Sequence, residues 1–313
     1  MGKYIVTSGQ NIYDVALHLH GSIEGVIDLL MNNTSLSLAE TLESGDELIY
    51  TDNYVINPGI VAYNRLHNIV PANGERNVYY KAPPESCNKI AIEVLLPGTA
   101  TFASLTIAGQ TPVYIDWGDN SVIQEIALAT APCYHHHSFD NLISHRRKIR
   151  VYSRGDITEA DFSGLNASAL YLLGHNAMER FTLTGATMNL DFIPAQEEVY
   201  YLDLTGIKTR SLLPLLENKK LMTLNLTDAR VSREAIDEYL IGLVKKHRGR
   251  RNCEVILTTE PSGEFQEPGR DGDLNYILTS GMEAIWVIVN EPAWNEGGSW
   301  KFNINSMLYT FQP

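Results

Sequence analysis

The chain has 313 residues, which is long enough for two or three domains with hydrophobic cores of their own. Hydrophobic residues make up 44% and charged residues 19%, a composition typical of a folded globular protein rather than a disordered one. The formal net charge of -13 argues against a general nucleic-acid binder, because phosphate contacts need clustered Lys and Arg.

Residues 1–53 are predicted to form a strand, two helices and a returning strand. KYIVT at 3–7 alternates apolar and polar side chains, as a half-buried strand should, and ELIYT at 47–51 reads as the returning strand. Asn11 is placed to cap a helix whose apolar face is formed by Ile12, Val15, Ala16 and Leu19. Gly21 ends this helix, and Ser22 with Glu24 begins a second one that ends near Asn32-Asn33.

The stretches YIVTSGQNIYDVA, DLLMNNTSL and LESGDELIY of this segment resemble the LysM family, whose fold is two antiparallel strands with two helices on one side. The resemblance implies a sugar groove between two loops, formed by Gly9, Gln10, Asn11 and Ile12 on one side and by Asn32, Asn33 and Thr34 on the other. Backbone and amide groups there would bond the N-acetyl groups of a glucosamine polymer such as peptidoglycan or chitin, and Ile12 would give an apolar contact. The alternative is that the glycine and the asparagines are turn residues of a purely structural, tethering module.

Residues 54–86 are predicted to be a linker. Pro58-Gly59, Ala72-Asn73-Gly74 and Pro83-Pro84 indicate turns within an extended connector. A segment of this kind after a LysM-like opening is similar to prophage-encoded tail or baseplate-associated proteins.

Residues 87–152 are predicted to form a small β domain, similar to a sandwich. Strands are expected in NKIAIEVLLPG at 88–98 and ATFASLTIAG at 100–109, and a hairpin in VYIDWGDNSVIQEIAL at 113–128. The hairpin, His137-Ser-Phe139 and the strand KIRVYS resemble PKD-like domains of the immunoglobulin fold. Asn120 stands where that family usually has Gly, and about 65 residues are few for a complete seven-stranded sandwich.

This segment also holds a candidate metal site. Consecutive histidines on a strand point to alternate faces, so His135 and His137 share a face that His136 does not. Zinc needs three or four converging ligands, and the local geometry supplies two, even with His145 nearby. We therefore expect no metal and no cofactor, and we expect Asp116 and Asp119 to cap turns. The tripeptide Arg154-Gly155-Asp156 is interpreted as a chance match to an adhesion motif.

Residues 153–259 repeat a pattern of three apolar positions, spaced L-x-x-L-x-L. The triplets are Ile157/Ala160/Phe162, Met178/Phe181/Leu183, Val199/Leu202/Leu204 and Leu221/Leu224/Leu226. Their regular spacing predicts parallel strands stacked over one core, as in a short leucine-rich-repeat solenoid, which the pattern resembles. Leu165, Ala186, Ile207 and Ala229 replace the inward Asn of that family, so the turn groups need other partners. An amphipathic helix, AIDEYLIGLVKKH, and a strand, CEVILT, are expected to close the core.

Residues 260–313 are predicted to be a C-terminal cap. Ser280-Gly-Met-Glu283 forms a capping-box pattern before AIWVIV, although that apolar run also fits a buried strand. WKFNIN and MLYTF read as strands. Trp286, Trp294 and Trp300 either plug the end of the solenoid or form an exposed patch for a partner.

The functional expectation follows from these parts, which make a multidomain α+β protein built of recognition modules. No motif such as GxSxG or HExxH is present, so we expect no enzyme activity. We expect a non-enzymatic, prophage-derived binding or assembly protein that contacts a glycan and a protein partner, but neither nucleic acid nor membrane. The alternatives are a cell-surface adhesion protein and an accessory to a wall hydrolase. No secretory signal is visible and no apolar run spans a bilayer, so a cytoplasmic or phage-particle location is expected, with Cys87, Cys133 and Cys253 reduced.

Overall fold

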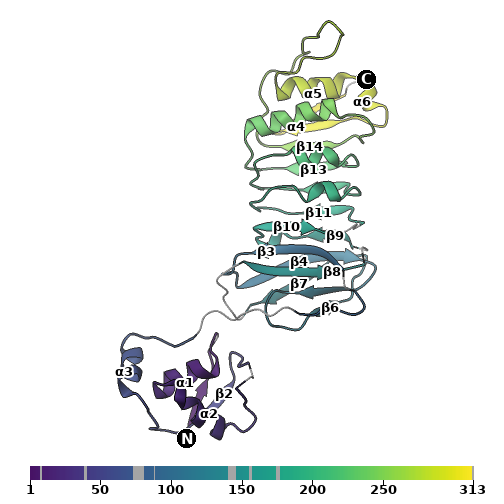
Figure 1. The fold of residues 1–313 in the computed structure, drawn as a ribbon. Helices are drawn as coiled ribbons and strands as arrows, with labels where there is room; N and C mark the ends of the chain where they lie inside the picture. Colours follow the sequence, from purple (N-terminus) through teal and green to yellow (C-terminus); the bar gives the residue numbers. More distant parts are fainter. Residues whose placement is uncertain are drawn as a thin grey trace. The chain divides into compact units, whose positions relative to one another are not determined.

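The computed structural model describes residues 1–7, 9–38, 41–72, 81–87, 89–139, 146–154, 157–173 and 177–311. The fold is mixed α+β, as expected, and the chain divides into two compact units (Figure 1). The first unit comprises residues 1–79, 98–101 and 138–146, and the second comprises residues 80–97, 102–137 and 147–313.

The first unit has the predicted order of strand, two helices and strand. Its elements are β1 (Gly2–Ile5), α1 (Ile12–His20), η1 (Ile23–Gly25), α2 (Val26–Asn32), β2 (Glu47–Tyr50) and α3 (Pro58–Leu66). β1 and β2 pair antiparallel, with Tyr4 opposite Leu48. Three of the four residues of the predicted apolar face of the first helix lie in the core, and the fourth, Leu19, is partly buried against it. The core residues are Val6, Ile12, Val15, Ala16, Val26, Leu29, Leu42 and Leu48.

The third helix was not expected. Pro58-Gly59, predicted to be a turn in a connector, instead begins α3, because Pro at the first helical position loses no hydrogen bond and its φ suits a helix. The side chain of Asn57 caps the helix by accepting from the Ile60 backbone N–H. α3 packs on α1, so at least part of the predicted linker belongs to the folded first unit.

The second unit contains two sheets. The first is antiparallel, in the order β10-β3-β8-β5-β6, and its strands are β3 (Ile90–Leu96), β5 (Val113–Asp116), β6 (Gln124–Ile126), β8 (Arg147–Tyr152) and β10 (Ala169–Leu172). These strands include the predicted hairpin β5–β6 and the predicted final strand β8.

The other sheet has the order β16-β15-β14-β13-β12-β11-β9-β4-β7. Its strands are β4 (Phe102–Gly109), β7 (Cys133–Ser138), β9 (Ile157–Asp161), β11 (Arg180–Thr182), β12 (Tyr201–Asp203), β13 (Thr223–Leu226), β14 (Glu254–Leu257), β15 (Lys301–Ile304) and β16 (Met307–Thr310). The strands from β9 to β15 are parallel, while β4 and β16 pair antiparallel at either end of this run.

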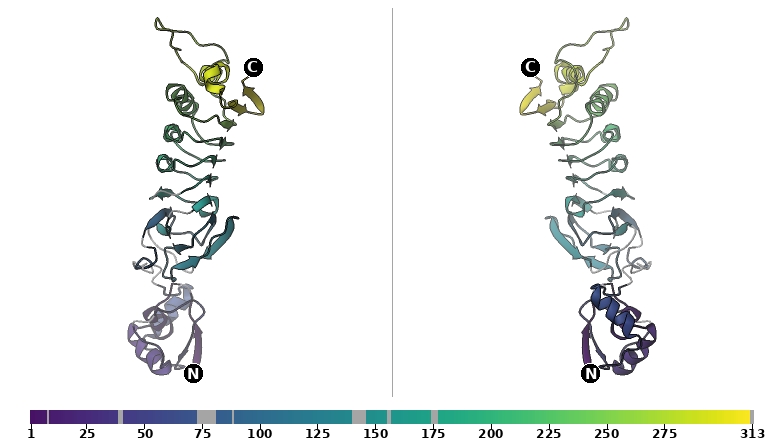
Figure 2. Two further views of the ribbon diagram at one scale, coloured as in Figure 1. Left: turned by 90° about the vertical axis from the view of Figure 1, so that its right-hand side faces the viewer. Right: turned by 90° about the vertical axis from the view of Figure 1, so that its left-hand side faces the viewer.

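The four apolar triplets lie on or beside parallel strands and face one core. Every member of the four apolar triplets is buried, and the central members lie opposite one another across the sheet, Ala160 to Phe181 to Leu202 to Leu224. Helical turns return the chain between strands: η2 (Ser163–Leu165), η3 (Ile193–Ala195), η4 (Leu213–Glu217) and α4 (Arg233–Lys245). Figure 2 shows strands along one side of this array and helical turns along the other.

The turns after the strands are held without an Asn ladder. Backbone N–H groups of one repeat donate to carbonyls of the next, as from Gly185 to Thr205 and from Gly206 to Thr227. In three repeats, a side chain at the end of the strand accepts a hydrogen bond from the backbone N–H two residues further along the chain. These side chains are Asp161, Asp203 and Asn225. These bonds satisfy turn backbone groups that the sequence predicts to need partners other than an inward Asn.

Strands from both sides of the boundary predicted near residue 152 share the two sheets. β10, in the segment predicted to be repeats, pairs with β3, while β4, in the predicted β domain, pairs with β9. The described strands of both segments therefore lie in one compact unit.

The C-terminal segment settles one open alternative, between a helix and a buried strand. AIWVIV lies in a helix, α5 (Gly281–Asn290), whose N-cap Ser280 accepts from the Glu283 backbone N–H. The short helix α6 (Pro292–Asn295) follows it. Trp300 is 2% exposed and stacks on Phe302, whereas Trp286 and Trp294 are half-buried. Within the described ranges, no helix is both long and apolar enough to cross a membrane.

Candidate carbohydrate-binding site

The seven residues predicted to bind sugar lie in two loops of the first unit. Gly9 to Ile12 form the turn into α1, where Gly9 has a φ of 85° that favours glycine. Asn32 to Thr34 form the exit from α2, where Thr34 is exposed. Hydrogen bonds of these residues stay within each loop or run to other parts of the unit, and none joins the two sets among the residues described.

The first loop uses its polar side chains internally. Gln10 is 1% exposed, accepts from the Tyr4 hydroxyl and the Thr7 N–H at 2.9 Å, and donates to the Pro71 carbonyl at 2.9 Å. Asn11 caps α1 by accepting from the N–H groups of residues 13 and 14, in a capping box with Asp14. Ile12 is 2% exposed and belongs to the core, so it has little apolar surface for a ligand.

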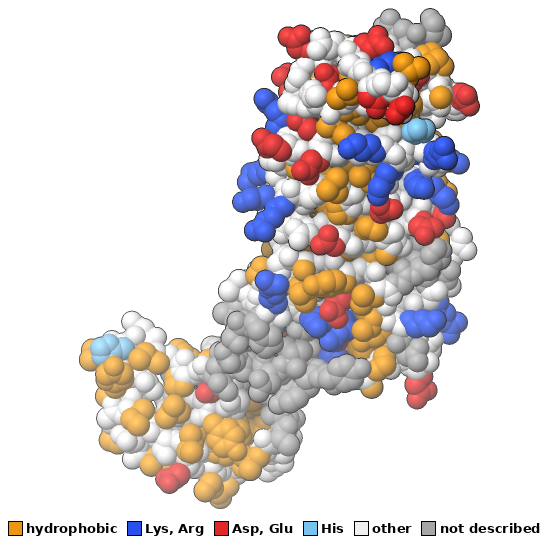
Figure 3. Space-filling view, turned by 45° about the horizontal axis from the view of Figure 1, so that its top comes forward, with side chains coloured by type: hydrophobic (Ala, Val, Ile, Leu, Met, Phe, Trp, Pro, Cys, Tyr) orange, Lys and Arg blue, Asp and Glu red, His pale blue; other side chains and the backbone are white. Residues whose placement is uncertain are grey.

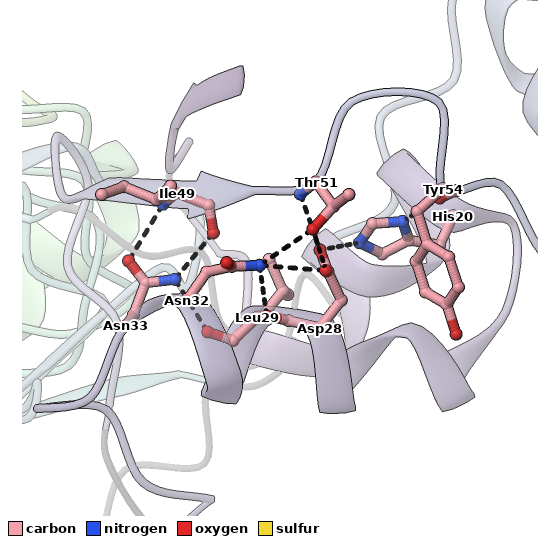
Figure 4. A network of polar contacts seen from close by, with 8 residues as sticks. All are labelled: His20, Asp28, Leu29, Asn32, Asn33, Ile49, Thr51 and Tyr54. Carbon is pink, nitrogen blue, oxygen red and sulfur yellow. Dashed lines mark hydrogen bonds and ion pairs between the residues drawn. The ribbon is translucent and has the colours of Figure 1, made fainter. Parts of the chain in front are cut away.

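The second loop is tied to β2 in the same way (Figure 4). The Asn33 side chain donates to the carbonyls of Leu29 and Ile49 at 2.8 Å and accepts from the Ile49 N–H at 2.9 Å, so it extends the strand pairing of β2. Asn32 donates to the backbone and side chain of Asp28. The amides that the LysM resemblance assigns to sugar binding therefore hold the loops in place.

Asp28 is the centre of this network. It accepts from the Thr51 N–H at 2.9 Å and from the Thr51 hydroxyl at 2.5 Å, and it lies 3.4 Å from Nε2 of the fully buried His20. Burial opposes ionisation of this carboxyl, but the hydrogen bonds from Thr51 and the charge of His20 outweigh burial and lower its pKa. The ring of His20 also contacts the Tyr54 carbonyl at 2.5 Å, so the segment after β2 is joined to the end of α1.

A cleft of about 550 Å³ opens beside this segment, within the first unit. It is bounded by the end of α1, the end of β2, and α3 with the turn that follows it; its polar lining includes His18, Asp52, Asn53, Asn64, Arg65 and Asn68. The sequence interpretation missed this cleft, because it took residues 54–86 for a connector. The feature of the sequence that could have indicated a polar site here is the set of asparagines at 53, 57, 64 and 68.

The outer face of α3 is apolar. Ile60, Tyr63 and Leu66 recur every third residue and are 37%, 57% and 78% exposed. Hydrophobic and uncharged side chains also dominate the face of this unit that is visible in Figure 3. α3 thus contacts α1 on one side and carries an open hydrophobic stripe on another.

The candidate metal histidines lie on β7 of the second unit. His137 lies 2.6 Å from Asp119, and its ring stacks on Trp117 with centroids 5.0 Å apart. His135 and His137 lie on the same face of β7, as predicted, while His136 is exposed. Among the described residues no group of three or more His, Cys, Asp and Glu side chains is placed to hold a metal, and His145 lies outside them.

The predicted capping by the two aspartates is confirmed. Asp116 accepts from the Gly118 N–H, and Asp119 accepts from the N–H and hydroxyl of Ser121. Asp119 lies between Ser121 and His137: it accepts from the Ser121 hydroxyl and lies 2.6 Å from Nε2 of His137. The cluster closes the β5–β6 turn onto β7. Gly155 and Asp156 of the tripeptide at 154–156 lie outside the described residues.

The outward face of the parallel sheet carries rows of aligned polar side chains. One row is Glu159, Arg180, Tyr201, Thr223, Glu254 and Lys301. Arg180 lies 3.8 Å from Glu159 and 4.3 Å from the centre of the Tyr201 ring. All six side chains are exposed or half-buried, so this face is open in the described chain.

No family model, curated protein or solved structure matches this chain. The resemblances to LysM, PKD-like and leucine-rich-repeat families therefore rest on the quoted residues and on the arrangement of elements.

Proposed function

We propose that this chain is a non-enzymatic binding and assembly protein. In this proposal, a LysM-like first unit binds an N-acetylglucosamine polymer, and a leucine-rich-repeat array in the second unit is a platform for protein contacts. The observation that carries the proposal is the registered parallel sheet, which presents aligned polar side chains from successive strands on one open face. Repeat surfaces of this kind are extended and suit another protein better than a small metabolite.

The composition of that face supports a protein partner. Its acidic, basic and aromatic side chains alternate along the row from Glu159 to Lys301, and part of their charge is already satisfied within the row. Figure 3 likewise shows acidic and basic side chains interspersed over the second unit. A mixed surface favours a specific protein over a polyanion such as nucleic acid.

The glycan part rests on the LysM-like order of elements together with the quoted sequence stretches. Because Gln10, Asn11 and Asn33 have internal partners, a glycan at the two loops would be held by backbone groups and by Thr34. The context we propose is a prophage-derived tail or baseplate assembly, on the similarity of the opening and its following segment to such proteins.

Two measurements test the proposal. The full chain should co-sediment with insoluble peptidoglycan or chitin, and purification from its native context should recover it with particle components. A chain that stays in the supernatant has no glycan function of this kind. Recovery as a lone monomer that hydrolyses a glycan would overturn both the binding and the assembly parts.

A further inference from the structure

The amides of the first unit fall into two groups that differ in their hydrogen bonding. Those of the predicted sugar loops, Gln10, Asn11 and Asn33, all bond within the unit. The amides that line the cleft, Asn53, Asn64 and Asn68, have no side-chain partner among the residues described. Polar groups free to bond a ligand are therefore concentrated in the cleft.

Asn64 and His18 make the cleft more than a solvated surface. Asn64 is 9% exposed, and its buried Nδ2 lacks a partner among the described residues. Nδ1 of His18, in the same lining, is also buried without one. A buried polar nitrogen without a partner costs about 1–3 kcal/mol, so a small shift of either side chain that brings its nitrogen to a ligand or a water in the cleft is favourable.

The charges of the cleft favour a neutral ligand. The formal charges of its lining are Arg65 and Asp52, and the Asp52 carboxylate also pairs with the N-terminal ammonium at 2.5 Å. Burial, and after it the positive charge of Arg65, lowers the pKa of His18, so this ring is neutral near pH 7 and offers both a donor and an acceptor. A ligand with many hydroxyl and amide groups fits such a lining better than a strong anion or cation.

The remaining lining adds an aromatic and aliphatic surface. Tyr50, Val55, Val61, Ile69 and Val70 lie alongside the amides. A volume of about 550 Å³ is in the range of small-molecule sites. Amides that bond hydroxyl and acetamido groups, next to an aromatic ring that contacts the apolar face of a sugar, are the features that a neutral amino-sugar needs.

We propose that this cleft, rather than the two loops, is the principal site for a neutral N-acetylated glycan. The inference rests on the proposed glycan function and assigns it to Asn53, Asn64, Arg65 and Asn68, with His18 and Tyr50. It places the site partly on α3, outside the βααβ arrangement of strands and helices.

The test titrates the full chain with a soluble tetramer of N-acetylglucosamine, measured by calorimetry. Asn53 and Asn68 have φ of 64° and 53°, so the double variant Asn53→Gly/Asn68→Gly removes both amides and keeps backbone conformations that glycine tolerates. Asn305→Gly, the same change at a φ of 48° in the second unit, is the matched control. Thr34→Ala probes the loop site.

We expect the double variant to weaken binding about tenfold or more, because each lost hydrogen bond is worth roughly 1 kcal/mol. Asn305→Gly and Thr34→Ala should each change the affinity for the tetramer by less than about twofold. In amide NMR spectra, the Asn64 side chain should shift on titration.

The alternative outcomes are distinct. If the unaltered chain binds and only Thr34→Ala weakens binding, or if the double variant binds normally, the cleft assignment is overturned and the proposed glycan function stands. If the unaltered chain binds neither the tetramer nor insoluble peptidoglycan or chitin, the glycan function fails and the cleft assignment fails with it.

Discussion

Asn218 is a buried residue that holds successive repeats together on the side opposite the sheet. It is 1% exposed, and its side chain donates to the backbone carbonyls of Ile193 and Gln196 at 3.1 Å and 2.6 Å. The backbone carbonyl of Asn218 accepts from the Arg250 guanidinium. Nothing in the L-x-x-L-x-L pattern marks this position, because the contacts run between return turns rather than between strands.

We predict that Asn218→Ala lowers the free energy of unfolding by about 1–3 kcal/mol, because it removes two buried hydrogen bonds, to the carbonyls of Ile193 and Gln196. Urea denaturation measures this loss. The exposed Asn189 is the control, and its replacement by Ala should change stability by less than about 0.5 kcal/mol. Equal losses of unfolding free energy in the two variants would show that the hydrogen bonds of Asn218 do not stabilise the repeats.

Asp119 makes stability depend on pH in the acid range. Burial opposes its ionisation, but hydrogen bonds from His137 and Ser121 outweigh burial and lower its pKa to about 2. Since the folded-state pKa lies below the ordinary value of 3.8, the carboxylate stabilises the fold above pH 4. This contribution declines as the pH falls from about 4 to about 2.

We therefore predict that Asp119→Ala destabilises the second unit at pH 7. The difference in stability between the variant and the unaltered chain should shrink as the pH falls toward 2. Thermal melts of both chains across this range measure the effect. A deficit that stays constant from pH 7 to pH 2 would contradict the assigned role of the carboxylate.

At the scale of the element, the parallel strands are stabilised by the apolar rows between them. Leu204 and Leu224 are both 0% exposed and lie on adjacent strands or their extensions in the repeat core. Each strand of this run is short, β12 having three residues, so hydrogen bonds along one strand contribute little and packing between repeats dominates.

We predict that Leu204→Ala or Leu224→Ala lowers the free energy of unfolding by about 2–5 kcal/mol, from lost burial and the cavity that remains. Met222, 49% exposed beside the same strand, is the control, and its replacement by Ala should cost less than about 0.5 kcal/mol. Losses below about 0.5 kcal/mol for both leucines would refute the repeat core.

At the scale of the whole molecule, the first unit extends past the βααβ order that the sequence predicts. The N–H groups of Ile56 and Asn57 both donate to the His20 carbonyl at the end of α1, and Gln10 reaches Pro71. A fragment of residues 1–72 keeps these bonds and α3, whereas a fragment of residues 1–56 loses most of them.

We predict that fragment 1–72 is more stable than fragment 1–56 by about 2 kcal/mol or more, because several buried hydrogen bonds and the α1–α3 contact are retained. Urea melts followed by circular dichroism compare the two. Coincident unfolding curves would show that α3 adds nothing to the unit.

The sequence by itself determined the local elements and the repeat core. The capping box at Asn11, the end at Gly21 and the N-cap at Ser280 are decided by residues within four positions of one another. The apolar triplets at 157–226 predict parallel strands because a fixed spacing brings equivalent side chains into one core. Such short-range and periodic patterns are visible without knowing what lies across the fold.

Only the tertiary structure decided which polar groups are free. The sequence predicts that Gln10 and Asn33 bond sugar, but Gln10 donates to the Pro71 carbonyl, 61 residues away, and Asn33 bonds to Ile49. The joining of β10 to β3 and the packing of α3 on α1 are contacts of the same long-range kind. Spacing along the chain carries no information on partners so far apart, because burial of apolar surface brings them together only when the whole unit folds.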